Sequence, residues 1–142
     1  MTDIGKIGEQ FVAQWLISQG WQLLHERWRS PGGEIDIIAQ HHNSNTIIFV
    51  EVKTRKRDNW DQEGILSVTP KKQEKIRQTA HYFLGEYPQF SNFICRFDVA
   101  LVNHQPCYQS ASNNRNITIK IGEPIQWQGY QLTLLEYIEA AF

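Results

Sequence analysis

Apolar residues near the start of the chain recur at the spacing of an α-helix. They are Ile4, Ile7, Phe11, Val12, Trp15 and Leu16. This periodicity predicts a helix that Asp3 caps and Gly20 ends. Glu9 lies at the edge of the apolar stripe, and taken alone this position indicates a boundary side chain that reaches toward solvent.

Short runs rich in Ile and Val come next, and they predict β-strands. Residues 21–28 form one plausible strand, and the Ser-Pro-Gly-Gly turn at 30–33 leads to a second over 34–40. A polar loop at 41–46 separates this strand from a third over 47–55. The last two runs therefore predict a hairpin.

The second half of the chain alternates again between helix and strand patterns. Thr69 followed by Pro70 predicts the start of a helix that ends around residues 85–88. The remaining segments predict a strand at 93–102, a long loop at 103–116, a strand at 117–122 and a short amphipathic helix at 132–142. This order predicts an α/β or α+β fold, a single domain over residues 1–142 with helices packed against a central mixed sheet.

The predicted hairpin places two carboxylates opposite each other. If its connection is symmetric about Asn43 and Ser44, Asp36 faces Glu51 across the two strands. Their Cβ atoms would then lie about 4.5–5.5 Å apart. A shift of one residue would separate them, so this expectation depends on the register.

Facing carboxylates among apolar neighbours repel each other unless a proton or a cation neutralises them. Mg²⁺ binds through one or two carboxylates together with water and phosphate oxygens, which Asp36 and Glu51 are suited to supply. Lys53 follows two residues later on the same face, where it would orient water or stabilise developing charge. The alternative is an exposed, salt-bridged ladder of Glu34, Asp36, Glu51 and Lys53 on a solvated face.

Composition limits the class of protein. The chain has 142 residues and a net charge of -1, which excludes a globally basic protein that coats nucleic acid. No apolar run is long enough to cross a membrane. Cys95 and Cys107 have neither metal-ligand spacing nor a disulfide framework, so a reduced, cytoplasmic setting is expected.

Basic residues gather in one stretch despite the near-neutral total. Residues 53–77 hold eight of the 14 Lys and Arg and only four of the 15 acidic residues. The residues predicted to contact nucleic-acid phosphates are Arg55, Lys56, Arg57, Lys72 and Lys75. Trp60 is suited to stack on an unpaired base. A solvated loop and helix surface is the alternative for each basic residue, and a partner contact or simple packing is the alternative for Trp60.

Several motifs together resemble a known family. Gly-Glu-Ile-Asp-Ile-Ile at 33–38 and Phe-Val-Glu-Val-Lys-Thr-Arg at 49–55 resemble the catalytic core of restriction-endonuclease-like nucleases. The further blocks GEQFVAQWL, VTPKKQEKIRQTAHYFL, RFDVALV and YIEAAF, in this order, make the chain similar to the YraN-like family of small bacterial proteins. These are similar in turn to archaeal Holliday-junction resolvases. The resemblance implies a restriction-endonuclease-like α/β fold and suggests metal-dependent nuclease activity.

The resemblance also implies roles for particular residues. Asp36 and Glu51 match the metal-binding acids, and Lys53 matches the catalytic lysine. Glu9 matches a first-helix glutamate that completes the metal site in resolvase-like relatives, and Gln73 matches a glutamine near the active site. The acidic loop that follows Arg57 departs from the tighter loop of many relatives.

These patterns lead to an expected function. We expect a Mg²⁺- or Mn²⁺-dependent phosphodiesterase that acts on DNA, with branched or structured DNA favoured over plain duplex. The alternative is a non-catalytic nucleic-acid-binding or scaffold module that retains the fold. Symmetric cutting of two strands would need paired active sites and hence a homodimer.

Overall fold

The computed structural model describes residues 3–57, 68–107 and 118–142, and in these ranges the chain forms a mixed sheet with helices packed against it. In chain order the elements are α1 (Ile4–Ser18), β1 (Gln22–Ser30), β2 (Gly33–His41), β3 (Thr46–Lys56), α2 (Pro70–Glu86), the 3-10 turn η3 (Pro88–Phe90), β4 (Ile94–Pro106), β5 (Ile125–Trp127) and β6 (Tyr130–Ile138). This is the predicted single-domain α/β architecture, and it is consistent with a restriction-endonuclease-like fold.

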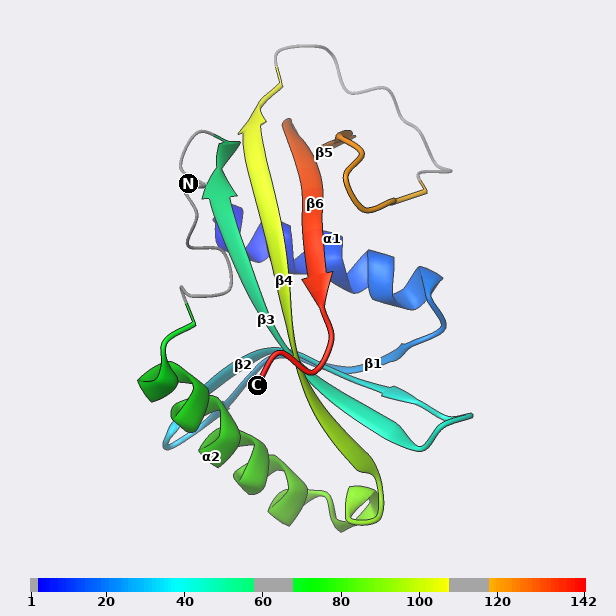
Figure 1. The fold of residues 1–142 in the computed structure, drawn as a ribbon, viewed down its shortest axis with the longest axis vertical. Helices are drawn as coiled ribbons and strands as arrows, with labels where there is room; N and C mark the ends of the chain where they lie inside the picture. The colour runs from blue at the N-terminus through cyan, green and yellow to red at the C-terminus, as the bar shows by residue number, and fades with distance from the viewer. Residues whose placement is uncertain (1–2, 58–67, 108–117) are drawn as a thin grey trace.

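The six strands lie in the order β1-β2-β3-β4-β6-β5. β3 and β4 are parallel, and every other neighbouring pair is antiparallel. The arrowheads of β3 and β4 accordingly point the same way in Figure 1, whereas that of β6 points the opposite way. A parallel pair requires a crossover connection, and α2 lies within the connection between β3 and β4.

The two faces of the sheet carry two separate apolar cores. Alternate β3 residues, such as Val50 and Val52, pack with α1 on one face. Ile47 and Phe49 pack with α2 on the other face. Side chains alternate along a strand, so the odd-numbered Glu51 belongs to the face that α2 covers.

Both helices begin where the sequence predicts. Asp3 Oδ1 accepts a 3.1 Å hydrogen bond from the Lys6 amide, and Thr69 Oγ1 accepts one of 3.2 Å from the Lys72 amide. Pro70 occupies the first turn of α2. An N–H group in that turn makes no hydrogen bond within the helix, so the helix loses nothing because proline lacks one. No helix in the described ranges combines the length and the apolar character that a membrane span requires.

The hairpin of β2 and β3 has the predicted register. Ile37 pairs with Val50 and His41 pairs with Thr46, with no shift between these two pairs. The connection is thus symmetric about Asn43 and Ser44, as expected. This confirms the predicted register, on which the expected proximity of Asp36 and Glu51 depends.

The end of the chain differs from the prediction. Residues 132–142 do not form a helix, because β6 pairs with β4 from Pro106↔Tyr130 to Val99↔Ile138. Gln128 and Gly129 have φ values of 49° and 85° and connect β5 to β6. Positive φ at both central residues is the signature of a two-residue hairpin turn, so local turn geometry and pairing with β4 override the helical pattern.

The segment before this hairpin also differs. The strand predicted at 117–122 is wrong for its described part, because residues 118–122 form no strand and β5 begins at Ile125. β4 continues to Pro106, into the predicted loop at 103–116, because β6 offers it pairing partners that far. The rest of that loop, from residue 108, lies outside the described residues.

Candidate active site

The hairpin brings Asp36 and Glu51 together at the point where its backbone pairing stops. The β2–β3 ladder ends at Ile37↔Val50, and the two acids occupy the next position on each strand. Asp36 Oδ2 accepts a 2.8 Å hydrogen bond from the backbone N–H of Val52. The Asp36 carboxylate is therefore tied to the strand that carries Glu51.

This proximity is electrostatically unfavourable for two charged carboxylates. Burial, followed by the negative charge of Glu51, raises the pKa of Asp36 to about 8, although the Val52 N–H opposes the shift. Glu51 is itself only 8% exposed. A proton or a cation is needed to relieve the repulsion between these acids.

Two lysines reach the same carboxylate from different elements. Lys72 Nζ lies 2.8 Å from Glu51 Oε1, and Lys53 Nζ lies 3.7 Å from the same oxygen. Burial and then the neighbouring Lys72 lower the pKa of Lys53. Burial is also the largest single influence on the pKa of Lys72 and acts to lower it, but the contacts with Glu51 and Lys53 and the charges of Glu51 and Asp36 together raise it. Lys53 is therefore the lysine that gives up its proton more readily.

A cavity of about 260 Å³ opens beside these groups, with Asp36, Glu51, Lys72 and Lys75 in its wall. It lies between β2 and α2. These two elements approach closely, because a Cβ added at Gly33 would lie 2.9 Å from Thr79 Oγ1. The cavity thus opens where a glycine lets the helix come near the sheet.

Glu9 is positioned from the opposite face of the sheet. A Cβ at the preceding Gly8 would lie 2.1 Å from Thr54 Oγ1, so α1 packs tightly on β3 at this point. Glu9 is buried and accepts bonds of 3.0 Å to each carboxylate oxygen, from Nε and Nη2 of Arg27. Burial raises the pKa of Glu9 even though Arg27 acts against the shift.

The carboxylates near the cavity can be compared with the ligands that a metal ion requires. Among residues 3–57, 68–107 and 118–142, no group of three or more His, Cys, Asp or Glu side chains is gathered so that it would hold a metal. The structure brings Asp36 and Glu51 together, while Glu9 is engaged by Arg27. Two carboxylates still suit Mg²⁺, because this ion commonly keeps several waters and uses one or two protein acids. A dication would also relieve the repulsion that raises the pKa of Asp36.

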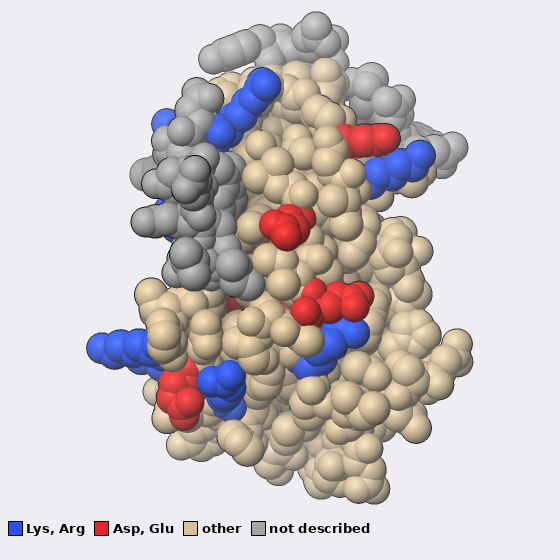
Figure 2. All heavy atoms as spheres, in the orientation of Figure 1, with Lys and Arg blue, Asp and Glu red and all other residues tan. Residues whose placement is uncertain are grey.

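The residues predicted to contact phosphates are divided between α2, where Lys72 and Lys75 line the cavity, and the end of β3. Arg55, Lys56 and Arg57 are exposed where β3 ends, and Arg57 Nη1 donates a 3.2 Å hydrogen bond to Gln105 Oε1. Lys75 is exposed on α2. Figure 2 shows basic side chains over the region of α2, with acidic side chains beside them. The predictions for Trp60 and the acidic loop concern positions outside the described residues.

Three contacts at the site were not predicted from the sequence. Lys72 was expected to contact phosphate, but its nearest acidic partner is Glu51. Gln73 donates its side-chain amide to the Val68 carbonyl at 3.0 Å and so fastens the segment before α2 to the helix. Arg27 has no motif that identifies it, because its bond to Glu9 joins residues 18 positions apart.

Known sequences match almost the whole chain. Residues 8–102 match the model of the family described as "Uncharacterised protein family UPF0102". UPF0102 protein sll0189 of Synechocystis sp. is 48% identical over 148 residues, which cover 100% of this chain and 99% of the relative. UPF0102 protein AM1_3954 of Acaryochloris marina is 44% identical over 98% of this chain and 89% of its own length. UPF0102 protein alr1796 of Nostoc sp. is 48% identical over 99% of this chain and 94% of its own length. The chain therefore belongs to the UPF0102 family, the YraN-like group that its motifs resemble.

Proposed function

We propose that this protein is a Mg²⁺- or Mn²⁺-dependent nuclease that hydrolyses phosphodiester bonds in DNA. The observation that carries the proposal is the pair of half-buried Asp36 and buried Glu51, which line a cavity of about 260 Å³ together with Lys72, while Lys53 also contacts Glu51. The resemblance to restriction-endonuclease-like nucleases supports it, since the same residues match the acids and the lysine of that pattern.

In this proposal Asp36 and Glu51 hold the divalent cation. The Val52 N–H fixes one oxygen of Asp36, and Lys72 fixes one oxygen of Glu51, so both carboxylates are oriented before substrate arrives. A bound dication supplies Lewis-acid stabilisation of the phosphate and lowers the pKa of water. The carboxylates offset the charge of the cation and confine it to the cavity.

Lys53 and Lys72 have different roles. Lys53 has a lowered pKa and a half-buried position, so it is suited to exchange a proton with water or to donate a hydrogen bond to a phosphate oxygen. Lys72 retains its proton and holds Glu51. With Lys75 in the same cavity wall it also offers positive charge to the phosphate.

The basic residues beyond the cavity would position the nucleic-acid backbone. Arg55, Lys56 and Arg57 continue from Lys53 along β3 and are exposed, so they are suited to contact the phosphates of a nucleic-acid strand that runs from the cavity along β3. Contacts of this kind are independent of base sequence and weaken with salt. A net charge of -1 over the whole chain limits non-specific duplex binding, which agrees with a preference for structured or branched DNA. Symmetric cleavage of a junction would use a homodimer.

A cleavage panel tests the proposal. Linear, flapped and four-way DNA and single-stranded RNA are incubated with Mg²⁺ or Mn²⁺ and with wild type, Asp36→Asn, Glu51→Gln and Lys53→Met. Glu136→Gln changes an exposed acid on β6 and is the matched control. We expect cleavage by wild type and by the control, with a loss of at least about 100-fold in the three site variants.

Two results would count against a nuclease. One is cleavage that persists in all three site variants, which would show a contaminating activity. The other is an absence of cut product on every substrate with either ion. DNA binding without cleavage would then favour the non-catalytic module, whose binding would survive Asp36→Asn.

A further inference from the structure

Arg27 and Glu9 form a bidentate ion pair, and the charge of Glu9 acts on Asp36 of the proposed cation site. Arg27 Nε lies 3.0 Å from Glu9 Oε1, and Nη2 lies 3.0 Å from Oε2. The Glu9 side chain is only 11% exposed and that of Arg27 31%. A bidentate pair between a buried carboxylate and a half-buried guanidinium is among the stronger charge-assisted contacts in proteins.

The backbone of Arg27 is held in an unfavourable conformation. Its φ is 51°, in the left-handed region that residues other than Gly, Asn and Asp seldom adopt. Arg27 Nη2 also lies 3.1 Å from Asp3 Oδ2, next to the first turn of α1. Two acids from the beginning of the chain therefore hold a strained arginine on β1. Persistent strain of this kind indicates a constrained position.

Glu9 lies within electrostatic reach of the carboxylate pair without joining it. Its charge acts on Asp36, yet the described residues hold no group of three acids gathered around one point. The acid that would complete a three-carboxylate site is thus present but bound to a guanidinium. This arrangement differs from the role that the family resemblance implies for Glu9.

We propose that Arg27 is a positioning residue that keeps Glu9 away from the cation and thereby weakens the affinity of the site for divalent ions. The inference rests on the proposed function, since it takes Asp36 and Glu51 as the cation site. With Arg27 on Glu9, two carboxylates are available to the cation. With Arg27 removed, a third negative charge turns toward it, and affinity in oxygen-ligand sites rises with the number of charged ligands.

The consequence is a weak cation site that substrate helps to complete. Phosphate oxygens supply ligands that Mg²⁺ uses readily in place of protein acids. While Arg27 holds Glu9, DNA has to contribute such an oxygen before the ion is firmly held. Arg27 therefore links cation binding to the presence of a phosphodiester.

Calorimetric titration of the DNA-free protein with MnCl₂ tests this inference. Four forms are compared: wild type, Arg27→Asn, Glu9→Gln and the double variant. Asn is chosen because it tolerates a positive φ and lacks the positive charge of the Arg27 guanidinium. We expect Arg27→Asn to bind Mn²⁺ at least about tenfold more tightly than wild type. In the double variant this gain is expected to disappear, because no third carboxylate remains to be freed.

Two further variants protect the test against loss of folding and against general charge effects. Arg27→Lys keeps the positive charge but cannot make the bidentate contact with Glu9. We expect its Mn²⁺ affinity to lie between those of wild type and Arg27→Asn. Asp3→Asn keeps a capping oxygen for α1 and removes the other acid that Arg27 contacts. It is expected to leave Mn²⁺ affinity within about twofold of wild type.

An unchanged or weaker Mn²⁺ affinity in both Arg27 variants would overturn the inference, as would a gain that persists in the double variant. A gain that persists would show that losing the positive charge of Arg27 is enough to tighten Mn²⁺ binding, without any contribution from Glu9. No Mn²⁺ binding in any form would also reject it. Tighter binding that depends on Glu9, but without DNA cleavage by wild type, would support this inference and count against the nuclease.

Discussion

Asp36, one position beyond the last paired residue of β2, accepts a 2.8 Å hydrogen bond from the backbone N–H of Val52 on β3. The bond joins a carboxylate on one strand to the backbone of the strand that carries the second acid. It keeps the two acids together although their charges repel. The pair is thus maintained by backbone geometry at a local energetic cost.

The first prediction concerns this cost. Burial and the Glu51 charge raise the pKa of Asp36 from 3.8 to about 8 in the folded chain. The folded state therefore holds a proton that the unfolded chain releases, so stability falls as pH rises between these values, by up to about 1.4 kcal/mol per pH unit. We expect Asp36→Asn to flatten this decline and to be more stable than wild type near pH 8. Urea unfolding at several pH values, with EDTA present to remove metal ions, measures this pH dependence of the free energy of unfolding.

The matched control for this prediction is Asp36→Ala. Asn retains an oxygen that accepts from the Val52 N–H, whereas Ala leaves that N–H without its partner. We expect Asp36→Ala to be about 1–3 kcal/mol less stable than Asp36→Asn. An Asp36→Asn protein whose stability depends on pH as strongly as that of wild type would contradict the prediction.

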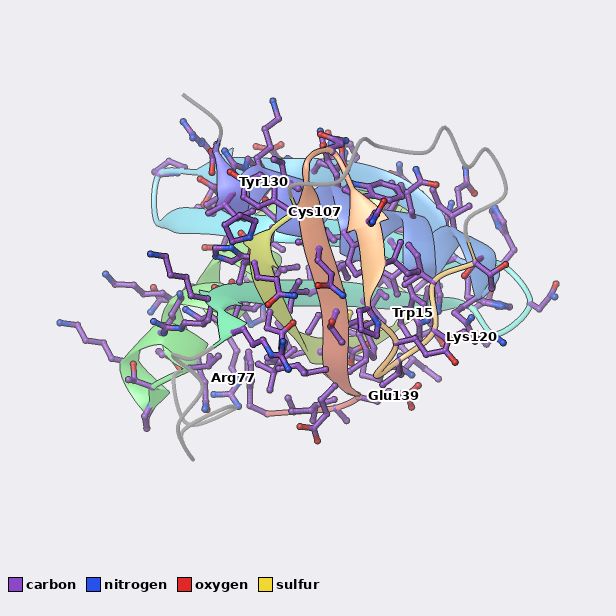
Figure 3. The ribbon with its side chains drawn as sticks, turned by 90° about the horizontal axis from the view of Figure 1, so that it is seen from above. Trp15, Arg77, Cys107, Lys120, Tyr130 and Glu139 are labelled. Atoms are coloured by element: carbon purple, nitrogen blue, oxygen red, sulfur yellow. The ribbon has the colours of Figure 1, made fainter. Side chains whose placement is uncertain are left out.

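The second prediction separates Lys72 from the other surface lysines. Lys72→Met removes a cation next to Glu51 and beside the proposed phosphate position. We expect weaker DNA binding and a salt dependence whose slope is smaller by about one. Lys120→Met is the control, since Lys120 lies far across the molecule from Arg77 of α2 in Figure 3. Fluorescence anisotropy over a range of salt concentrations measures the slope, and equal effects of both variants would reject a specific role.

The third prediction tests the contact between α1 and β3. Ala favours a helix over Gly by about 1 kcal/mol, but its Cβ at position 8 would lie 2.1 Å from Thr54 Oγ1. Overpacking then dominates, and we expect Gly8→Ala to lose about 1–3 kcal/mol of stability. Thr54→Ala removes the obstructing hydroxyl, which is buried and has no hydrogen-bond partner among the residues that the structure describes. The double variant should recover most of the loss in a denaturant-based mutant cycle, and additive losses would show that the two residues do not interact.

The fourth prediction concerns a buried acid on β4. Asp98 is fully buried and accepts two bonds of 2.9 Å from Arg96, one of 2.6 Å from the Tyr137 hydroxyl and one of 3.0 Å from the Ala140 amide. Asp98→Leu leaves these donors unpaired, and we expect a loss of about 3–5 kcal/mol. Tyr137→Phe removes one bond and should lose about 1 kcal/mol. Comparable losses in the two variants would argue against a network centred on Asp98.

The sequence predicts the features that depend on local pattern. The β2–β3 register follows from a short polar loop between two apolar runs, so Asp36 and Glu51 come together as expected. The starts of both helices follow from Asp3 and Thr69, whose side-chain oxygens accept amide hydrogen bonds within one turn. Local hydrogen bonding and alternation are encoded in adjacent residues, which makes them visible in a single sequence.

Features that depend on distant partners were missed. Leu132 and Leu134 are buried in a strand because β4 lies beside them, and the helical pattern of the same residues does not reveal this neighbour. Gln128 and Gly129 were the available turn signal. The Arg27–Glu9 and Lys72–Glu51 contacts join separate elements, and no spacing rule connects them. The site's acids and Lys53 beside them were therefore predictable, whereas the contacts that Arg27 and Lys72 make with the acids were not.

The parallel pairing of β3 with β4 also determines the order in which the site assembles. A hairpin closes over a few residues, whereas the β3–β4 pair forms only after a long connection containing α2 has been folded back. Short-range closure carries the smaller loss of chain entropy. The hairpin that carries Asp36 and Glu51 is thus favoured to form before α2 docks with Lys72. A newly folding chain therefore has only Lys53 of the hairpin near its two acids at first and gains Lys72 with the crossover.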